Sequence, residues 1–175
     1  MLKILIAEDD KDSALLYKRA LEKRSHQVMI THNGEECLDI YHEESQNARN
    51  DINANQGIQK PFDAIILDYK MPKINGMEVA KEILAVNPHE RIIFASAYVK
   101  ETLVDSIKQL NKVTELMQKP FDQQALIDTI EDKEIYSELE KLNINTDYLQ
   151  AGKIPHEKLI ELLEILRRLQ KKRTY

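Results

Sequence analysis

The sequence lacks several features that would identify other classes of protein. It contains a single cysteine, Cys37, so it cannot form an internal disulfide and offers no cysteine set for zinc or redox chemistry. Cys37 lies in an amphipathic stretch, where a free thiol usually packs as a small buried side chain. We therefore expect Cys37 to be buried rather than to act as a nucleophile.

Long apolar runs and a basic surplus are also missing. No apolar run approaches the roughly 20 residues that cross a bilayer, and Met1 leads straight into a strand-like run rather than a signal peptide. The formal net charge is −5, whereas nonspecific binding to nucleic acid requires a concentrated basic surface. These absences predict a cytoplasmic protein that contacts neither membranes nor, by charge alone, nucleic acid.

The chain instead contains five short apolar runs that alternate with helix-like stretches. This alternation indicates βαβ units, so we predict an α/β fold with a doubly wound (βα)5 parallel sheet covered on both faces. The expected strands are residues 2–7, 27–31, 62–68, 91–96 and 113–118. The expected apolar helix faces are Leu15, Leu16, Ala20 and Leu21; Cys37, Leu38 and Tyr41; Val79, Ala80, Ile83 and Leu84; Leu103, Val104, Ile107 and Leu110; and Leu126, Ile127 and Ile130.

Two segments differ in composition from this repeating pattern. Residues 43–61 are polar and separate the second helix from the third strand, so we expect a long inserted surface loop there. The domain itself is predicted to span residues 1–132. Residues 133–175 are too few for a winged helix-turn-helix domain and contain two helix-like pieces, so we expect a helical C-terminal extension.

The ends of the expected strands carry polar residues that suit one kind of chemistry. In an open parallel sheet, functional groups gather beyond the carboxyl ends of the strands. A cluster of carboxylates there would repel itself without a cation, and hard oxygen ligands suit Mg²⁺. A serine and a lysine could then donate hydrogen bonds to a transferred phosphoryl group. The residues concerned are Glu8, Asp9 and Asp10, then Asp68, Ser96 and Lys119.

The runs "ILIAEDD", "DAIILDYKMPKINGMEV", "FASA" and "QKPF" resemble the receiver domains of response regulators in two-component signal transduction. The resemblance covers residues 1 to about 132, and it implies a flavodoxin-like sheet with strand order 2-1-3-4-5. It also implies a phosphoprotein that takes its phosphoryl group from a sensor histidine kinase or a phosphotransfer protein. Such a receiver assists its own phosphorelay reaction and slow dephosphorylation, and it is a signalling protein rather than an enzyme.

The same resemblance assigns roles to individual residues. Asp68 would be the phosphoacceptor; Asp9 and Asp68 would bind Mg²⁺ directly, with Glu8 acting chiefly through water and the backbone carbonyl of Lys70 completing the protein ligands. Lys119 would hold a phosphoryl oxygen, and Ser96 would turn its hydroxyl toward the phosphate. The Lys119–Pro120 bond would be cis, as it often is in this family.

The sequence departs from the family at one position and carries bulk at two others. Three residues before the lysine, where an aromatic commonly reports the phosphorylated state, it has Leu116, so signalling through that aromatic is not expected. Tyr98 and Lys70 occupy the positions that flank the path of the attacking water, which predicts a long-lived phosphoprotein.

We assign no catalytic role to the five histidines, which are expected on loops or exposed faces: His26, His32, His42, His89 and His156.

Two other functions compete with phosphorylation on Asp68. A phosphatase of the haloacid dehalogenase type also uses aspartate, serine or threonine, lysine and Mg²⁺, but its nucleophile follows the first strand in an Asp-x-Asp pair. Here the residue two after Asp68 is Lys70, and the acids after the first strand are adjacent. The second alternative is a receiver that only docks partners, and the complete set of site residues argues against it.

The C-terminal extension carries an apolar stripe that must be buried. Leu159, Leu162, Leu166 and Leu169 repeat at alternating spacings of three and four, the seam of a short coiled coil. A helix of this length is marginal alone in water, so the stripe packs on a second subunit, on Ile135, Leu139 and Leu142, or on the receiver. We expect a homodimer.

The last turn of the C-terminal helix is cationic. These charges complement the helix dipole, so DNA binding is not expected.

Overall fold

The protein is described by a computed structural model that places residues 1–50, 60–97, 107, 110 and 115–131. A parallel sheet of five strands runs through this part of the chain in the order β2-β1-β3-β4-β5. The strands are β1 (Lys3–Ala7), β2 (Gln27–Thr31), β3 (Ala64–Asp68), β4 (Ile92–Ser96) and β5 (Glu115–Gln118). The predicted sheet and its strand order are therefore confirmed. Strands β1, β3 and β4 begin one or two residues later than predicted, and residues 113–114 of the fifth predicted strand lie outside the described residues.

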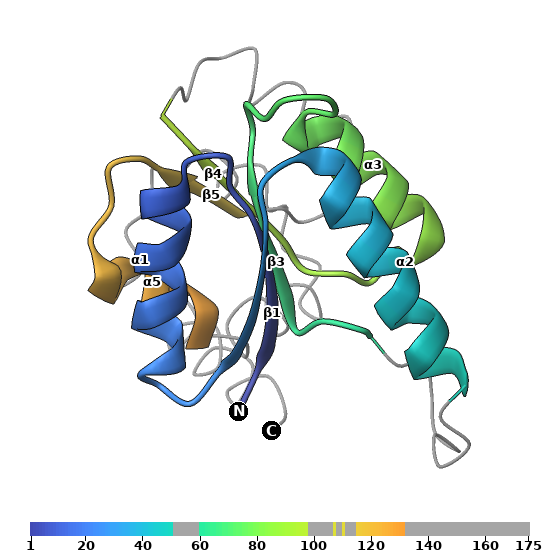
Figure 1. Ribbon diagram of the computed structural model, residues 1–175, viewed down its shortest axis with the longest axis horizontal. Helices are drawn as coiled ribbons and strands as arrows, with labels where there is room; N and C mark the ends of the chain where they lie inside the picture. Colours follow the sequence, from blue (N-terminus) through green and yellow to red (C-terminus); the bar gives the residue numbers. More distant parts are fainter. Residues whose placement is uncertain (51–59, 98–106, 108–109, 111–114, 132–175) are drawn as a thin grey trace, which may run out of the picture.

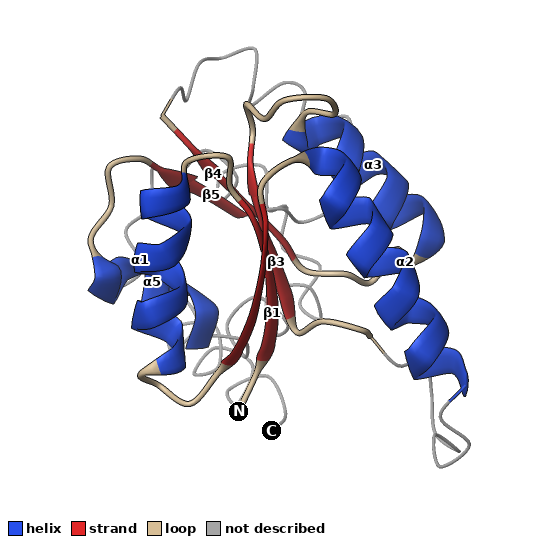
Figure 2. Ribbon diagram, in the orientation of Figure 1, coloured by secondary structure: helices blue, strands red, loops and turns tan. Residues whose placement is uncertain are grey.

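Helices cover both faces of the sheet, as Figures 1 and 2 show. Helices α2 (Gly34–Asn50) and α3 (Gly76–Val86) lie on one face, and α1 (Lys11–Glu22) and α5 (Gln123–Glu131) lie on the other. Alternate residues of each strand point to opposite faces, so Leu5 packs with α2 and α3 whereas Ile4 and Ile6 pack with α1 and α5. The near-continuous apolar strands of the sequence follow from this burial on two sides.

The buried face of α1 differs from the predicted one. Leu15 and Leu16 are exposed, with 42% and 46% of their surfaces accessible, while Ala14, Tyr17 and Leu21 face the sheet. The spacing of three and four between these buried residues matches the helix repeat. The ring of Tyr17, which was not in the predicted set, stacks on Phe121 with ring centres 5.1 Å apart. Placing Leu15 and Leu16 on the buried face was therefore wrong.

Helix α2 is longer than predicted. It continues to Asn50, so the expectation of a surface loop over 43–61 was wrong for residues 43–50, and residues 51–59 lie outside the described residues. Glu44 forms an ion pair with Lys3 of β1, and Ser45 is buried. The polar composition of this segment reflects a helix with most of its surface in water. Average polarity alone does not distinguish such a helix from a loop.

Two predicted helical segments lie largely or wholly outside the described residues. Of the fourth predicted helix, Ile107 is buried and Leu110 packs against the core beside α2 and α3. Leu103 and Val104 lie outside the described part of the chain, as does the expected extension over residues 133–175. No helix in the described ranges has the length and apolar character needed to cross a membrane.

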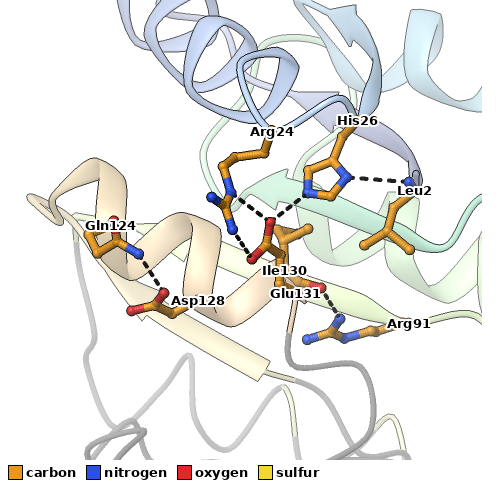
Figure 3. Close-up of polar contacts among 8 residues, drawn as sticks. All are labelled: Leu2, Arg24, His26, Arg91, Gln124, Asp128, Ile130 and Glu131. Atoms are coloured by element: carbon orange, nitrogen blue, oxygen red, sulfur yellow. Dashed lines mark hydrogen bonds and ion pairs between the residues drawn. The ribbon is translucent and has the colours of Figure 1, made fainter.

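The last turn of α5 is held at the edge of the sheet where the strands begin (Figure 3). Arg24 donates two hydrogen bonds of 2.9 Å to the carboxylate of Glu131, and His26 Nε2 lies 3.3 Å from the same group. The Leu2 N–H donates to His26 Nδ1, so the ring proton lies on Nε2. Arg91 donates to the carbonyls of Thr129 and Ile130, which places a cation at the negative end of the helix dipole.

Candidate functional site

The polar residues predicted at the strand ends all lie at the carboxyl edge of the sheet. Glu8 follows β1 and is buried, and Asp68 is the last residue of β3. Ser96 is the last residue of β4 and is also buried, while Lys119 directly follows β5. Because neighbouring parallel strands end at the same edge, residues far apart in the sequence become neighbours here.

Three carboxylates at this edge form a cluster that can hold a metal ion. Glu8, Asp9 and Asp68 each offer an oxygen, and these oxygens lie within 4.8 Å of one another. The three differ in exposure, since Glu8 is buried, Asp68 half-buried and Asp9 exposed. Carboxylate oxygens are the hard ligands that Mg²⁺ accepts, and an exposed edge leaves room for the waters that it keeps. The donor set therefore fits a magnesium ion.

The side chain of Lys119 lies between two of these carboxylates. Its Nζ is 2.5 Å from Glu8 Oε2 and 2.6 Å from Asp68 Oδ2, and only 16% of the side chain is exposed. Burial alone would lower the pKa of Lys119, but the hydrogen bonds to Asp68 and Glu8 outweigh burial and raise that pKa above its ordinary value. The ammonium therefore stays charged and neutralises part of the negative charge at this edge.

Glu8 has an altered affinity for protons. Burial raises the pKa of its carboxyl from 4.5 to about 7, and the hydrogen bond and charge of Lys119 oppose that rise. The nearby charge of Asp68 raises it further. A cation bound at the same oxygens would favour the charged form and lower the pKa of Glu8. The buried Glu8 carboxyl is therefore suited to a site that binds a cation, because the cation would stabilise its charged form.

The backbone around Asp68 is closely packed. The Lys70 N–H donates to Asp68 Oδ1 at 3.0 Å, which orients the carboxylate. At the start of α3, a Cβ on Gly76 would lie 2.2 Å from the carbonyl oxygen of Asp68, so only glycine fits there. The Lys119 N–H donates to the Ser96 carbonyl, and the Lys119–Pro120 bond is cis, as predicted.

Other predicted residues lie at or near this edge in different settings. Asp10 accepts a hydrogen bond of 2.7 Å from the Ser13 N–H, so it caps α1. Leu116 packs from β5 against the core on the α2 and α3 face. Tyr98 lies outside the described residues. Cys37 is fully buried, as predicted, and burial raises the pKa of its thiol to about 12.

Strand β2 contributes a contact that the sequence analysis missed. His32 directly follows Thr31, the last residue of β2, and its Nδ1 lies 3.1 Å from the carbonyl oxygen of Glu8. The expectation that His32 lies on a loop holds, but this loop touches the acidic cluster. The signal was available, because β2 ends at the same edge as the strands that were considered.

Comparisons with known proteins agree on one protein family. The family model described as the response regulator receiver domain matches residues 4–131. The chain is similar to sporulation initiation phosphotransferase F of Bacillus subtilis, at 27% identity over 73% of this chain and 90% of that protein. It is similar in structure to a response regulator receiver domain protein from Clostridium thermocellum (TM-score 0.61, 26% identity, 80% of this chain and 99% of that one). Another solved structure with the same fold is the CheX–CheY–BeF3–Mg²⁺ complex from Borrelia burgdorferi (TM-score 0.59, 22% identity, 73% and 85%).

Proposed function

The chain belongs to the response regulator receiver family, and on that premise we propose that Asp68 accepts a phosphoryl group in a Mg²⁺-dependent reaction. The observation that carries this proposal is the position of the Asp68 carboxylate at the end of β3, 2.6 Å from the Lys119 ammonium and clustered with Glu8 and Asp9. The donor is a phosphohistidine on a sensor histidine kinase or a phosphotransfer protein. The protein is a signalling phosphoacceptor, and Asp68 is its switch.

The transfer is an in-line displacement at phosphorus. An oxygen of Asp68 forms a bond to phosphorus while the bond to the donor's histidine nitrogen breaks, which leaves an aspartyl phosphate and a neutral imidazole once the nitrogen has gained a proton. Charge spreads over the phosphoryl oxygens in the transition state, so positioned cations and hydrogen-bond donors lower the barrier. The Lys70 N–H and the Lys119 ammonium already fix the orientation of the Asp68 carboxylate.

The acidic cluster and the β3–α3 segment supply ligands for the magnesium ion. Asp9 and Asp68 would bind it directly, Glu8 chiefly through water, and the Lys70 backbone carbonyl would complete the protein's share. When bound, the ion neutralises the charge between the carboxylates and the phosphoryl oxygens. The mutual distance of the three carboxylates supports this assignment. The Borrelia structure, with its BeF3 and Mg²⁺, supports the same pairing of phosphoryl group and metal.

Lys119 and Ser96 act on the transferred group. Lys119 would donate a hydrogen bond to a phosphoryl oxygen, because its ammonium has three donors, of which Glu8 and Asp68 accept two, and lies beside the acceptor oxygen. Asp68 is in register with Ala95 on the adjacent strand, so Ser96 lies one residue beyond it toward the site. Its hydroxyl would donate to another phosphoryl oxygen.

The proposal is tested by incubating the full chain with acetyl phosphate and Mg²⁺. An adduct that alkali and hydroxylamine remove, and that does not form in EDTA, is the expected product of an acyl phosphate on a carboxylate. A chain that stays unlabelled at saturating Mg²⁺ would instead be a receiver that only docks partners. Continuous release of phosphate from phosphate monoesters would favour the phosphatase alternative.

We also propose that residues 133–175 form a dimerisation segment. Ile160, Leu163 and Ile165 widen the stripe of leucines at 159, 162, 166 and 169, so that it is wider than one short helix of the same chain can cover. We expect the full chain to scatter light as a dimer, and the double substitution Leu162→Asp and Leu166→Asp to convert it to a monomer, because two charges in the seam cannot be buried unpaired. The control carries Glu161→Lys and Glu164→Lys, which change charge without entering the stripe. A wild-type monomer, before and after beryllofluoride treatment, would contradict the proposal.

A further inference from the structure

The turn between β2 and α2, residues 31–36, contacts both segments that carry the proposed metal ligands. One segment is the end of β1 with Glu8 and Asp9, and the other is the stretch after β3 that includes Lys70. The side chains of this turn are not among the proposed ligands. The turn nevertheless lies directly against each segment, through different residues.

The first contact fixes the backbone of Glu8 on both sides. The Glu8 N–H donates to the carbonyl of Thr31 at 3.0 Å, and the Glu8 carbonyl oxygen lies 3.1 Å from His32 Nδ1. A carbonyl oxygen only accepts hydrogen bonds, so His32 Nδ1 carries the proton. The His32 side chain thereby continues the β1–β2 hydrogen bonding by one more step and holds the peptide from which both Glu8 and Asp9 project.

The turn that carries His32 is itself fixed. The His32 N–H donates to Glu36 Oε2 at 3.0 Å, and Asn33 Nδ2 donates to the other oxygen of the same carboxylate at 2.7 Å. Asn33 Oδ1 accepts from the Glu36 N–H at 3.0 Å. These bonds resemble a capping box at the start of α2, with the Glu36 carboxylate bonded to the His32 N–H and to the Asn33 side chain. His32 is therefore presented to Glu8 by a turn with little freedom.

The second contact braces the segment after β3. A Cβ on Gly34 would lie 2.2 Å from the carbonyl oxygen of Ile74, so the start of α2 packs against that backbone with no space to spare. Next to it, Lys73 forms an ion pair of 2.7 Å with Glu35. Lys73 has a φ of 68°, a left-handed conformation that a non-glycine residue adopts only where its surroundings impose it. The segment with Lys70 thus rests on the same turn as Glu8.

We propose that the β2–α2 turn positions the metal ligands, and that His32 is the positioning residue for Glu8 and Asp9. The inference rests on the proposed function, since it concerns the same magnesium site. Groups that orient metal ligands without touching the ion commonly change metal affinity about tenfold or more when they are removed. The carbonyl of Glu8 would lose its donor in His32→Ala, and the acidic side chains would no longer be held in one arrangement.

The test measures Mg²⁺ binding to the unphosphorylated full chain by calorimetry, together with its thermal unfolding without Mg²⁺. We expect His32→Ala to weaken Mg²⁺ binding about tenfold and to raise the Mg²⁺ concentration needed for half-maximal labelling by acetyl phosphate. His32→Asn should restore most of the affinity, because the asparagine Nδ2–H can take the place of the Nδ1–H. The matched control is His89→Ala, an exposed histidine between α3 and β4 at the opposite edge.

The outcomes separate this inference from the proposed function. Wild-type Mg²⁺ affinity in His32→Ala would overturn the inference, as would equal loss in His32→Asn and His32→Ala, or a lower unfolding temperature with unchanged affinity. If His32→Ala does not fold, Gly34→Ala provides the second variant, and it too should weaken Mg²⁺ binding by displacing the Ile74 carbonyl. A wild-type chain that binds Mg²⁺ but is never labelled would overturn the proposed function, while the calorimetric comparison would still decide the role of His32.

Discussion

Replacing Asp68 by asparagine is expected to reduce labelling by acetyl phosphate about 100-fold or more, because the variant removes the oxygen nucleophile itself. The asparagine keeps the size of the side chain, and its single carbonyl oxygen can still accept one of the two hydrogen bonds that Asp68 receives, from the Lys70 N–H at Oδ1 or from Lys119 at Oδ2. The fold should therefore survive, and the loss can be read as a loss of chemistry. The measurement is the amount of hydroxylamine-labile adduct at saturating Mg²⁺.

The matched control for this variant is Asp12→Asn, the same chemical change on the exposed first turn of α1. It should label like the wild-type chain. Equal labelling of Asp68→Asn and wild type would show that the phosphoryl group resides elsewhere, and the assignment of Asp68 would be wrong. Circular dichroism of both variants checks that neither change disturbs the helices.

A second large effect is expected from Glu90, a buried carboxyl at the opposite edge of the sheet. Its Oε1 accepts hydrogen bonds from Tyr41 at 3.2 Å and Asn87 at 2.8 Å, whereas its Oε2 has no partner within the described part of the chain. Burial raises the pKa of Glu90 from 4.5 to about 7; the hydrogen bonds from Tyr41 and Asn87 and the charge of Lys60 oppose this rise. The carboxyl therefore holds a proton in the folded state at pH values where the unfolded chain has lost it.

The sign of the effect on stability follows from this difference in proton binding. Between pH 4.5 and 7 the folded chain binds more protons than the unfolded chain, so the free energy of unfolding falls as the pH rises. The rise in the pKa of Glu90 from 4.5 to about 7 contributes about 3 kcal/mol to the free energy of unfolding. This contribution is complete below pH 4.5 and lost above pH 7.

Glu90→Gln should remove this pH dependence, because the amide is neutral throughout and its carbonyl oxygen can accept the hydrogen bonds from Tyr41 and Asn87. Urea unfolding at several pH values should give a flatter profile for the variant and a higher stability than wild type at pH 8. Glu8 titrates in the same direction, so the difference between variant and wild type isolates Glu90. Glu82→Gln, on the exposed side of α3, should keep the wild-type slope. A wild-type slope in Glu90→Gln would contradict the prediction.

The sheet and the acidic site could be predicted because both depend on local sequence. Runs such as 64–67 are apolar at every position, which marks a strand buried on two sides. The carboxyl ends of parallel strands share one edge, so Glu8, Asp68 and Lys119 could be placed together without knowing any contact. The strand order was carried by the family resemblance rather than by the spacing of the runs.

Other features could not be predicted because they depend on neighbours far away in the sequence. Leu15 and Leu16 are as apolar as a buried pair, and only the packing of Tyr17 on Phe121 shows which side of α1 faces inward. Residues 43–50 are polar enough for a loop, and they become helical where α2 is tied to β1 through Lys3. Burial of Glu90 likewise follows from Tyr41, which is distant along the chain.

The ring of His26 touches both ends of the receiver, since it accepts from the Leu2 N–H and contacts Glu131 (Figure 3). Residues 2 and 131 therefore lie close together, at the edge of the sheet opposite the one that carries Asp68. A unit with adjacent ends can be inserted into a loop of a host protein as well as fused to one of its termini, because both junctions then meet neighbouring host residues. For protein engineering, residues 2–131 are therefore expected to tolerate insertion into an exposed host loop, with the edge that carries Asp68 facing away from both joints.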